Sequence, residues 1–463
     1  MKRLSISRNH GLKFVNSFNI CVLVTVCLLG ACAKNSKAIQ LKAKITPQSS
    51  LSNAISPQPH MRPRRRYPRF GRPSGPGGPT RPQGIDLRVI SLERISTKVS
   101  EIAPRLLSST GPELDSTPAF IFGAITDQGK IIDGYGDIKL NSFREPNEDT
   151  KFGIGSLTKV LTGIILAEAV VNGEMVLDNS ANLYLPPDLQ LPSNNITLRQ
   201  LVTHTSGLPN YPENLSEYRD FDGDGINDSD QYSPGRNYSR KELSEWLESK
   251  PRLNFEPGSS GQYSNLGFGI LSLALENNLK YSSFEKMNEE IVTSRLSMTR
   301  THTNKDNDKI KFDSNQAQGY SINLDNGSLH SIPYSDMGIL EGAGELISTA
   351  SDILSLLETL SGIKNSILTP ALEEASKPLA NHRSDKIAYG FKIVKSSKGG
   401  VYYMKSGSTA GFSSIMLWRS NPKVGIVLLA NRGNFKKLNK LGVKIIEAMV
   451  VNSNLLGQNR PNI

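Results

Sequence analysis

The pattern of apolar and polar residues predicts strands near both ends of the folded region and helices in its middle. Short β-prone runs at 119–126 and 130–135 flank Asp127-Gln128-Gly129, a pattern typical of a hairpin turn. Further strands are predicted near the C-terminus at 401–405, 413–418 and 425–430. The other apolar patterns predict helices, at 85–107, 156–171, 198–202, 240–247, 266–279 and 437–451. We therefore expect one sheet built from both ends of the folded region, with a mostly helical insertion between them.

The first 31 residues have the pattern of an export signal. Basic residues precede an apolar run at 20–29, which is too short to span a bilayer comfortably. The run ends in Leu29-Gly30-Ala31-Cys32, which resembles the lipobox of bacterial lipoproteins, where that cysteine is acylated. We predict a signal peptide at 1–31, lipidation of Cys32 and an exported protein anchored to the membrane of the cell envelope. The alternative is an ordinary secretory signal with an incidental cysteine.

Residues 32–84 are rich in proline and arginine and are predicted to form a disordered tether, because they cannot bury enough apolar surface to fold. As a flexible coil, such a tether averages roughly 40 Å end to end. Its arginines could contact anionic polymers or lipid headgroups, or it could be a solvated spacer. The folded domain is assigned to residues 85–455.

The net charge of +11 comes from the N-terminal region rather than from the folded domain. Residues 1–85 contain fifteen Lys or Arg and no Asp or Glu, which leaves 39 basic residues against all 43 acidic ones beyond them. A mildly acidic domain argues against nucleic acid as a partner. No cysteine follows Cys32, so disulfides and cysteine chemistry are excluded from the folded domain.

Ser156-Leu157-Thr158-Lys159 follows Gly153-Ile154-Gly155 and precedes an apolar helix. Positions i and i+3 share a helix face, so the Ser156 hydroxyl and the Lys159 amine can meet. The helix N-terminus suits a developing oxyanion. Desolvation against the apolar helix would lower the pKa of Lys159 and let it accept the serine proton. Taken alone, this motif more often marks an N-cap serine and a surface lysine.

Tyr263-Ser264-Asn265 precedes a second apolar stretch. Residues two apart in an extended turn point the same way, so Tyr263 and Asn265 are predicted to face one pocket. The tyrosine could exchange a proton with Ser156 or a leaving group if a nearby lysine lowers its pKa, and the asparagine could bind a substrate amide. Alone, the tripeptide would be taken as structural.

Lys405-Ser406-Gly407-Ser408 lies on a predicted strand. Lys405 and Ser406 can bind a substrate carboxylate, and Gly407 leaves room for a ligand along the strand. The main-chain N–H of Ser408 can serve as an oxyanion donor. An edge-strand lysine with polar neighbours is the simpler alternative.

Together, in this order, the three elements resemble the signature of the serine β-lactamase and penicillin-binding DD-peptidase superfamily. The Tyr-x-Asn form is similar to the class C β-lactamase branch, and the stretches at 201–209 and 342–352 are also typical of it. The resemblance implies an α/β fold: an antiparallel β-sheet flanked by helices plus a helical subdomain. It also implies that Ser156 is the acylated nucleophile, that Lys159 and Tyr263 are general bases, and that Asn265, Lys405 and Ser406 bind substrate. His204 lies in a loop typical of the family, and we assign it no catalytic role.

The resemblance implies a serine acyl-enzyme hydrolase that needs no catalytic cofactor. Lys-Ser-Gly replaces the usual Lys-Thr-Gly, and many esterase relatives carry histidine where this chain has Lys405. The lysine favours carboxylate-bearing ligands: peptidoglycan peptides ending in D-Ala-D-Ala, cleaved by a DD-carboxypeptidase or endopeptidase, or β-lactams. A β-lactamase and an esterase remain the enzymatic alternatives, and a catalytically silent cell-wall binding protein is the alternative that is not an enzyme.

An acidic insertion at 215–236 resembles the D-x-D-x-D-G loop of calcium-binding repeats. Closely spaced aspartates repel one another unless a cation neutralises them. The spacing predicts structural calcium held by Asp220, Asp222, Asp224, the Ile226 carbonyl and Asp228. Gln231 stands where the loop usually closes with an acid, which predicts weak affinity. The alternative is an acidic surface loop.

Overall fold

A computed structural model describes residues 87–107, 116–218, 235–304, 314–323, 327–382 and 385–452. The chain divides into two units, Met1–Gly78 and Pro79–Ile463. All described residues belong to the second unit. The predicted signal peptide, the tether, Cys32 and all five predicted calcium ligands lie outside the described residues. None of the helices within the described ranges is both long and apolar enough to cross a bilayer.

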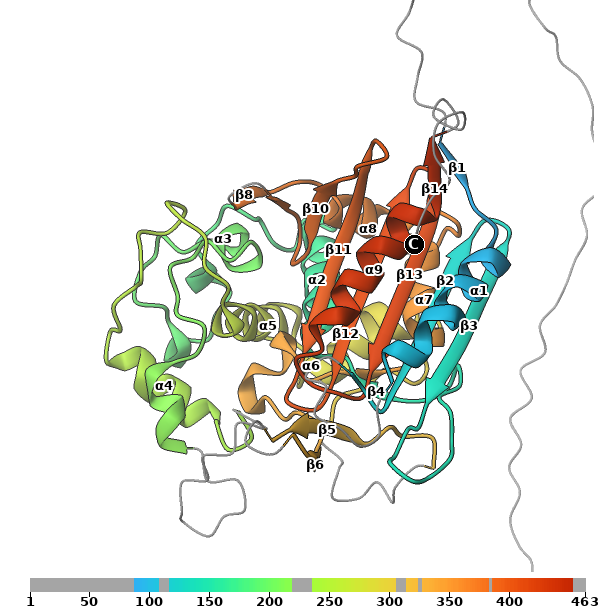
Figure 1. Cartoon of the computed structure of the whole chain (residues 1–463). Coiled ribbons are helices and arrows are strands. Elements are labelled where there is room, and N and C mark those ends of the chain that lie inside the picture. Colours follow the sequence, from blue (N-terminus) through green and yellow to red (C-terminus); the bar gives the residue numbers. More distant parts are fainter. Residues whose placement is uncertain are drawn as a thin grey trace, which may run out of the picture. The chain divides into compact units, whose positions relative to one another are not determined.

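An eight-stranded antiparallel sheet forms the centre of this unit, in the order β3-β2-β13-β12-β11-β10-β9-β8 (Figure 1). Strand β2 near the N-terminus pairs with β13 near the C-terminus, so the predicted sheet from both ends of the domain is confirmed. The strands run over β2 (Ala119–Thr126), β3 (Gly129–Gly136), β8 (Ala380–His382), β9 (Asp385–Ile387), β10 (Lys392–Lys395), β11 (Val401–Ser408), β12 (Ser413–Ser420) and β13 (Lys423–Ala430).

Helices cover both faces of the sheet, which explains why β12 and β13 are buried almost throughout. Side chains alternate along the strands: Phe120 and Phe122 join one core cluster, while Ile121 and Ile125 join the other. In Figure 1, α1 and α9 lie across one face of the sheet, and α7 and α8 lie on the other. The bounds are α1 (Leu92–Ile102), α7 (Ala350–Leu360), α8 (Thr369–Ala375) and α9 (Lys436–Ala448).

Helix α2 (Thr158–Val171) connects the sheet layer with the helical subdomain. Eleven of its fourteen residues are buried, as expected for a helix that is packed on all sides. It contacts α8 on the sheet side and α5 on the subdomain side. The subdomain, to the left in Figure 1, contains α3 (Leu198–Val202), α4 (Arg240–Glu248), α5 (Asn265–Leu279) and α6 (Phe284–Asn288). This arrangement matches the predicted α/β fold with a helical subdomain.

The predicted helices at the two domain ends were too long. The chain enters through β1 (Leu87–Val89), which pairs with β14 (Val450–Asn452), so α1 begins only at Leu92 and α9 ends at Ala448. The pairing joins segments about 360 residues apart, and local apolar periodicity carries no information about such a partner. Two small antiparallel pairs were also not predicted: β4 (Phe152–Gly153) with β7 (Ile347–Ser348), which lie far apart in the sequence, and the hairpin of β5 (Gly319–Ile322) with β6 (Leu329–Ile332).

Candidate active site

Ser156 lies in a short 3-10 turn, Gly155–Leu157, immediately before α2. It was predicted as the first residue of the helix, which instead begins at Thr158. Gly155 has a φ of +52°, and a Cβ on it would lie 3.0 Å from the nitrogen of Ser408. A glycine is therefore needed here, both for the left-handed conformation and for the close approach of β11.

Lys159 follows on the first turn of α2 and is fully buried. Its Nζ lies 3.4 Å from Ser156 Oγ, so the meeting predicted from the i, i+3 spacing is confirmed. The same nitrogen donates to Asn265 Oδ1 at 2.6 Å and to the carbonyl oxygen of Ala343. Burial, and next the charge of Lys405, hold the pKa of Lys159 well below its ordinary value of 10.5. The predicted desolvation is present, and it favours the neutral amine.

Tyr263 and Asn265 lie at the N-terminal end of α5, where Tyr263 contacts Ser156 and Asn265 contacts Lys159. The Tyr263 hydroxyl lies 2.5 Å from Ser156 Oγ. Ser264 caps α5 by accepting a hydrogen bond from the Gly267 N–H, which fixes the turn between Tyr263 and Asn265.

The expectation that a neighbouring lysine lowers the pKa of Tyr263 is wrong. Burial of its hydroxyl beside Ser156 raises that pKa above its ordinary value of 10.0 and is the largest influence on it, although 40% of the surface of Tyr263 is exposed. The physical reason is that Lys159, whose Nζ lies 4.8 Å from the centre of the tyrosine ring, is itself desolvated and favours its neutral form. The phenol therefore stays protonated, which suits an acid better than a base.

Strand β11 forms the opposite wall and carries Lys405, Ser406, Gly407 and Ser408. A Cβ on Gly407 would lie 2.2 Å from the carbonyl oxygen of Ile154 and 3.0 Å from the nitrogen of Ser156. Gly407 is therefore required because the serine turn packs directly against the strand. Packing against the serine turn therefore explains this glycine without the predicted role of leaving room for a ligand.

Two cavities lie beside this group of residues. The first, of about 270 Å³, contains Ser156, Asn265 and Ser408 and is open to solvent. It is also lined by Tyr211 and Met337, among others. The second, of about 260 Å³, contains Lys405, Ser406 and Tyr263. Tyr263 contacts Ser156 with its hydroxyl and lines the second cavity, whereas Asn265 lines the first. The prediction that these two residues face one pocket is therefore wrong.

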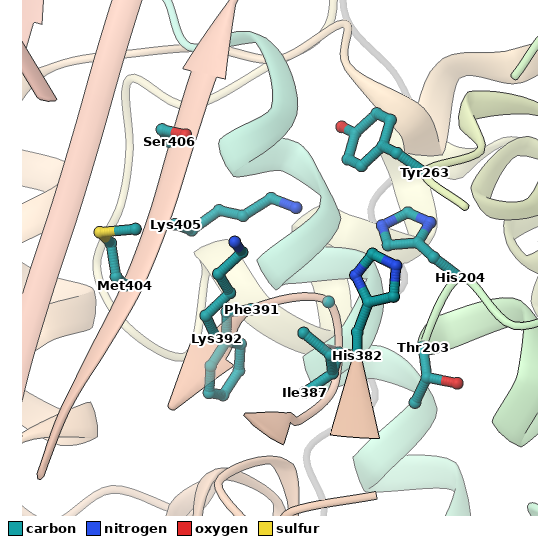
Figure 2. Close-up of a pocket in the computed structure, with 11 residues that line it drawn as sticks. Thr203, His204, Tyr263, His382, Ile387, Phe391, Lys392, Met404, Lys405 and Ser406 are labelled. Atoms are coloured by element: carbon teal, nitrogen blue, oxygen red, sulfur yellow. The ribbon is translucent and has the colours of Figure 1, made fainter. Parts of the chain in front are cut away.

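The second cavity is cationic (Figure 2). Lys405 on β11 and Lys392 on β10 extend their amines into the same space, opposite the rings of His204 and His382. Among the described residues, none that lines this cavity is acidic. Lys392 pairs with Asp385 at 2.7 Å, whereas burial, and next the charge of Lys392, lower the pKa of Lys405 to about 7. An anion in this cavity would stabilise the charged form of Lys405.

Lys392 and His382 were not among the predicted site residues, and His204 was predicted to have no catalytic role. Lys392 and His382 lie on the short strands β10 and β8, which have weak apolar patterns and were not predicted. His204 accepts a hydrogen bond from the Ser264 N–H at 3.2 Å, and its ring packs 4.4 Å from that of Tyr263. Burial holds the pKa of His204 well below 6.5, so the neutral ring supports Tyr263.

A sequence profile of the beta-lactamase family matches residues 121–447. D-alanyl-D-alanine-carboxypeptidase/endopeptidase AmpH of Escherichia coli (strain K12) is 31% identical over 175 residues, 37% of this chain and 42% of AmpH. A beta-lactamase of Lysobacter lactamgenus is 23% identical over 345 residues, 68% of this chain and 82% of that protein. The chain therefore spans less than half of AmpH.

Solved structures share the fold. The D-alanine carboxypeptidase AmpC from Burkholderia cenocepacia superposes with a TM-score of 0.61 at 21% identity, over 77% of this chain and 99% of that chain. The family and these neighbours are serine hydrolases, β-lactamases and DD-peptidases. The profile match contains Ser156, Lys159, Tyr263 and Lys405 and extends over well more than half of the sequence. On this basis, the chain belongs to the beta-lactamase family.

Proposed function

We propose that this protein is a serine acyl-enzyme hydrolase that cleaves peptidoglycan peptides ending in D-Ala-D-Ala, as a DD-carboxypeptidase or endopeptidase. The observation that carries the proposal is the cationic cavity beside Tyr263. Cleavage of a D-Ala-D-Ala peptide transfers the rest of the peptide to Ser156 and releases the terminal D-alanine as the leaving group. The carboxylate of that D-alanine lies just beyond the scissile bond, where a cation would bind it. Lys405 and Ser406 would bind that carboxylate, with Lys392 adding positive charge.

Acylation would begin with the neutral amine of Lys159 accepting the Ser156 proton while Oγ attacks the carbonyl carbon. The main-chain N–H groups of Ser156 and Ser408 would stabilise the oxyanion, and Asn265 would bind the amide of the acyl part. Tyr263, which retains its proton, would protonate the leaving nitrogen as the C–N bond breaks. Transfer of a proton from Lys159 to Tyr263 would reset both groups, and water would then release the acyl group.

The alternatives differ in what they require of the two cavities. A β-lactam also carries a carboxylate and would acylate Ser156, so a β-lactamase differs in how fast water removes the acyl group. An esterase would not require a lysine-lined cavity on the leaving-group side of the site. A catalytically silent binding protein would not require the contacts that join Ser156 to Tyr263 and Lys159.

Timed intact-protein mass spectrometry tests the proposal. The protein is incubated with a D-Ala-D-Ala peptide, with its C-terminal carboxamide and with a penicillin. We expect D-alanine release from the acid, at least tenfold slower cleavage of the amide, and a slowly hydrolysed penicillin adduct that Ser156→Ala lacks. Equal cleavage of acid and amide would refute the carboxylate assignment, rapid loss of the penicillin adduct would identify a β-lactamase, and turnover of simple esters alone would identify an esterase.

We further propose that acylation of Cys32 anchors the protein in the cell envelope. The apolar run and small residues before Cys32 support this location, as does the length of the predicted tether. Peptidoglycan lies within the reach of a domain held by such a tether. The partners would then be the membrane, through the lipid, and peptidoglycan, through the active site.

A further inference from the structure

Asn210 contacts the active site without touching Ser156, Lys159 or Tyr263. It lies at the end of the loop after α3, and its side chain is exposed. Its Oδ1 accepts two hydrogen bonds from Asn265, one from the main-chain N–H at 3.1 Å and one from Nδ2 at 3.0 Å. Since a main-chain N–H can only donate, it fixes the Asn210 amide with its oxygen toward Asn265.

This orientation passes to the next groups in the network. With Nδ2 of Asn265 held by Asn210, Oδ1 of Asn265 must face Lys159, which donates to it at 2.6 Å. The carbonyl oxygen of Ala343 can only accept, and it takes a second N–H of Lys159. A neutral amine has two N–H groups and one lone pair. With both N–H groups used, the lone pair is left for Ser156 Oγ, 3.4 Å away.

We propose that Asn210 is a positioning residue that fixes the direction of this hydrogen-bond network, so that Lys159 accepts the Ser156 proton rather than donating one. The inference rests on the proposed Ser156 chemistry and adds to it the group that sets the polarity of the site. If Asn210 did not hold it, the Asn265 amide could turn and present Nδ2 to Lys159. The lysine lone pair would then accept from Asn265 and be lost to Ser156.

Acylation by a fluorophosphonate tests the proposal, because fluoride leaves without a proton and without a carboxylate contact. The full chain is compared with Asn210→Ala, which removes the acceptor, and Asn210→Asp, whose carboxylate can only accept and so retains the polarity. The rates are compared at alkaline pH, where a new negative charge beside the network is least able to keep Lys159 protonated. Asn254→Ala is the matched control: this exposed asparagine bonds to Gln262 at 2.9 Å, outside both cavities.

We expect Asn210→Ala to lower the acylation rate about tenfold or more, part of the ~10²–10⁴-fold effect of a general base. Asn210→Asp should restore the rate to within about threefold of the parent, and all variants should melt within about 2 °C of it, as expected for exposed positions. Asn210→Ala reacting at the parent rate would overturn the proposal, as would Asn210→Asp failing as badly as alanine. A parent protein that is not labelled would instead overturn the proposed function.

Discussion

Lys405 is predicted to destabilise the folded protein at neutral and acidic pH. It is 92% buried, since only 8% of its surface is exposed, and in the part of the chain that the structure describes its ammonium has no hydrogen-bond or ion-pair partner. Among the described residues, the titratable groups around it are Lys392, Lys159, Tyr263, His204 and His382, and none is an acid. Burial and Lys392 lower the pKa of Lys405 from 10.5 to about 7.

The sign follows from proton binding. Between pH 7 and 10.5 the unfolded chain holds the Lys405 proton and the folded protein does not, so the free energy of unfolding rises with pH. Below pH 7 both states are protonated, and the folded state carries the full penalty. A pKa lowered from 10.5 to about 7 corresponds to about 5 kcal/mol of penalty on the acidic side, and to about 2 kcal/mol at pH 9.

Lys405→Met keeps the apolar stem and removes the charge. The variant should be more stable than the parent by up to about 5 kcal/mol at pH 6, with the gain falling as the pH rises toward 10.5. Urea denaturation at pH 6, 7.5 and 9, followed by tryptophan fluorescence, measures this. The gain should be accompanied by loss of carboxylate-dependent turnover, because the same unpaired cation would bind the substrate.

Lys392→Met is the control, since Lys392 is partly exposed and paired with Asp385. Burial is the larger cause of the Lys405 shift, so this variant should keep most of the pH dependence. The reasoning is refuted if Lys405→Met is no more stable than the parent at pH 6 and the two pH profiles run parallel. It would then follow that water or a local rearrangement solvates the ammonium.

Three further predictions concern other parts of the chain. Lys159→Ala should slow fluorophosphonate acylation by ~10²-fold or more. Tyr263→Phe should slow cleavage of peptides far more than reaction with the fluorophosphonate. If Tyr263→Phe slowed both reactions equally, the acid role of Tyr263 would be contradicted. Calcium at ~10⁻⁴–10⁻³ M should raise the melting temperature of chelator-treated protein, but not of Asp222→Asn/Asp224→Asn, and identical melts would leave only an acidic surface segment. The native protein should partition into detergent, whereas Cys32→Ser should leave it soluble or unprocessed; unacylated, soluble native protein would exclude lipidation.

The residues that local spacing connects could be predicted from the sequence. Ser156 and Lys159 are three positions apart at the start of an apolar helix, and helix geometry alone brings them together. The short turn between Tyr263 and Asn265 correctly predicted that the two lie close together, but they line different cavities rather than the one pocket that was predicted. The order of the three motifs then indicated the family. The central strands were predictable as well, because their apolar runs are long and continuous.

The second cavity could not be predicted, because it depends on pairing between segments without a strong pattern. Strands β8, β9 and β10 are three or four residues long, and they join the sheet edge only because β10 pairs with β11, β9 with β10 and β8 with β9. The pairing of β10 with β11 brings Lys392 beside Lys405. The two lie 13 residues apart in the sequence, and Lys392 belongs to none of the three motifs. Asn210 was missed for a related reason: its contact with Asn265 joins two loops 55 residues apart.

The roles of the two proton-handling groups show where sequence reasoning stops. Proximity follows from spacing, but the direction of a pKa shift depends on which group loses more solvent. Lys159 and Tyr263 were both expected to become bases, with the lysine charge lowering the tyrosine pKa. Burial favours the neutral form of each group, and these neutral forms differ in function: a neutral amine accepts a proton, and a neutral phenol donates one. A single physical effect, desolvation, therefore favours Lys159 as the base and Tyr263 as the acid.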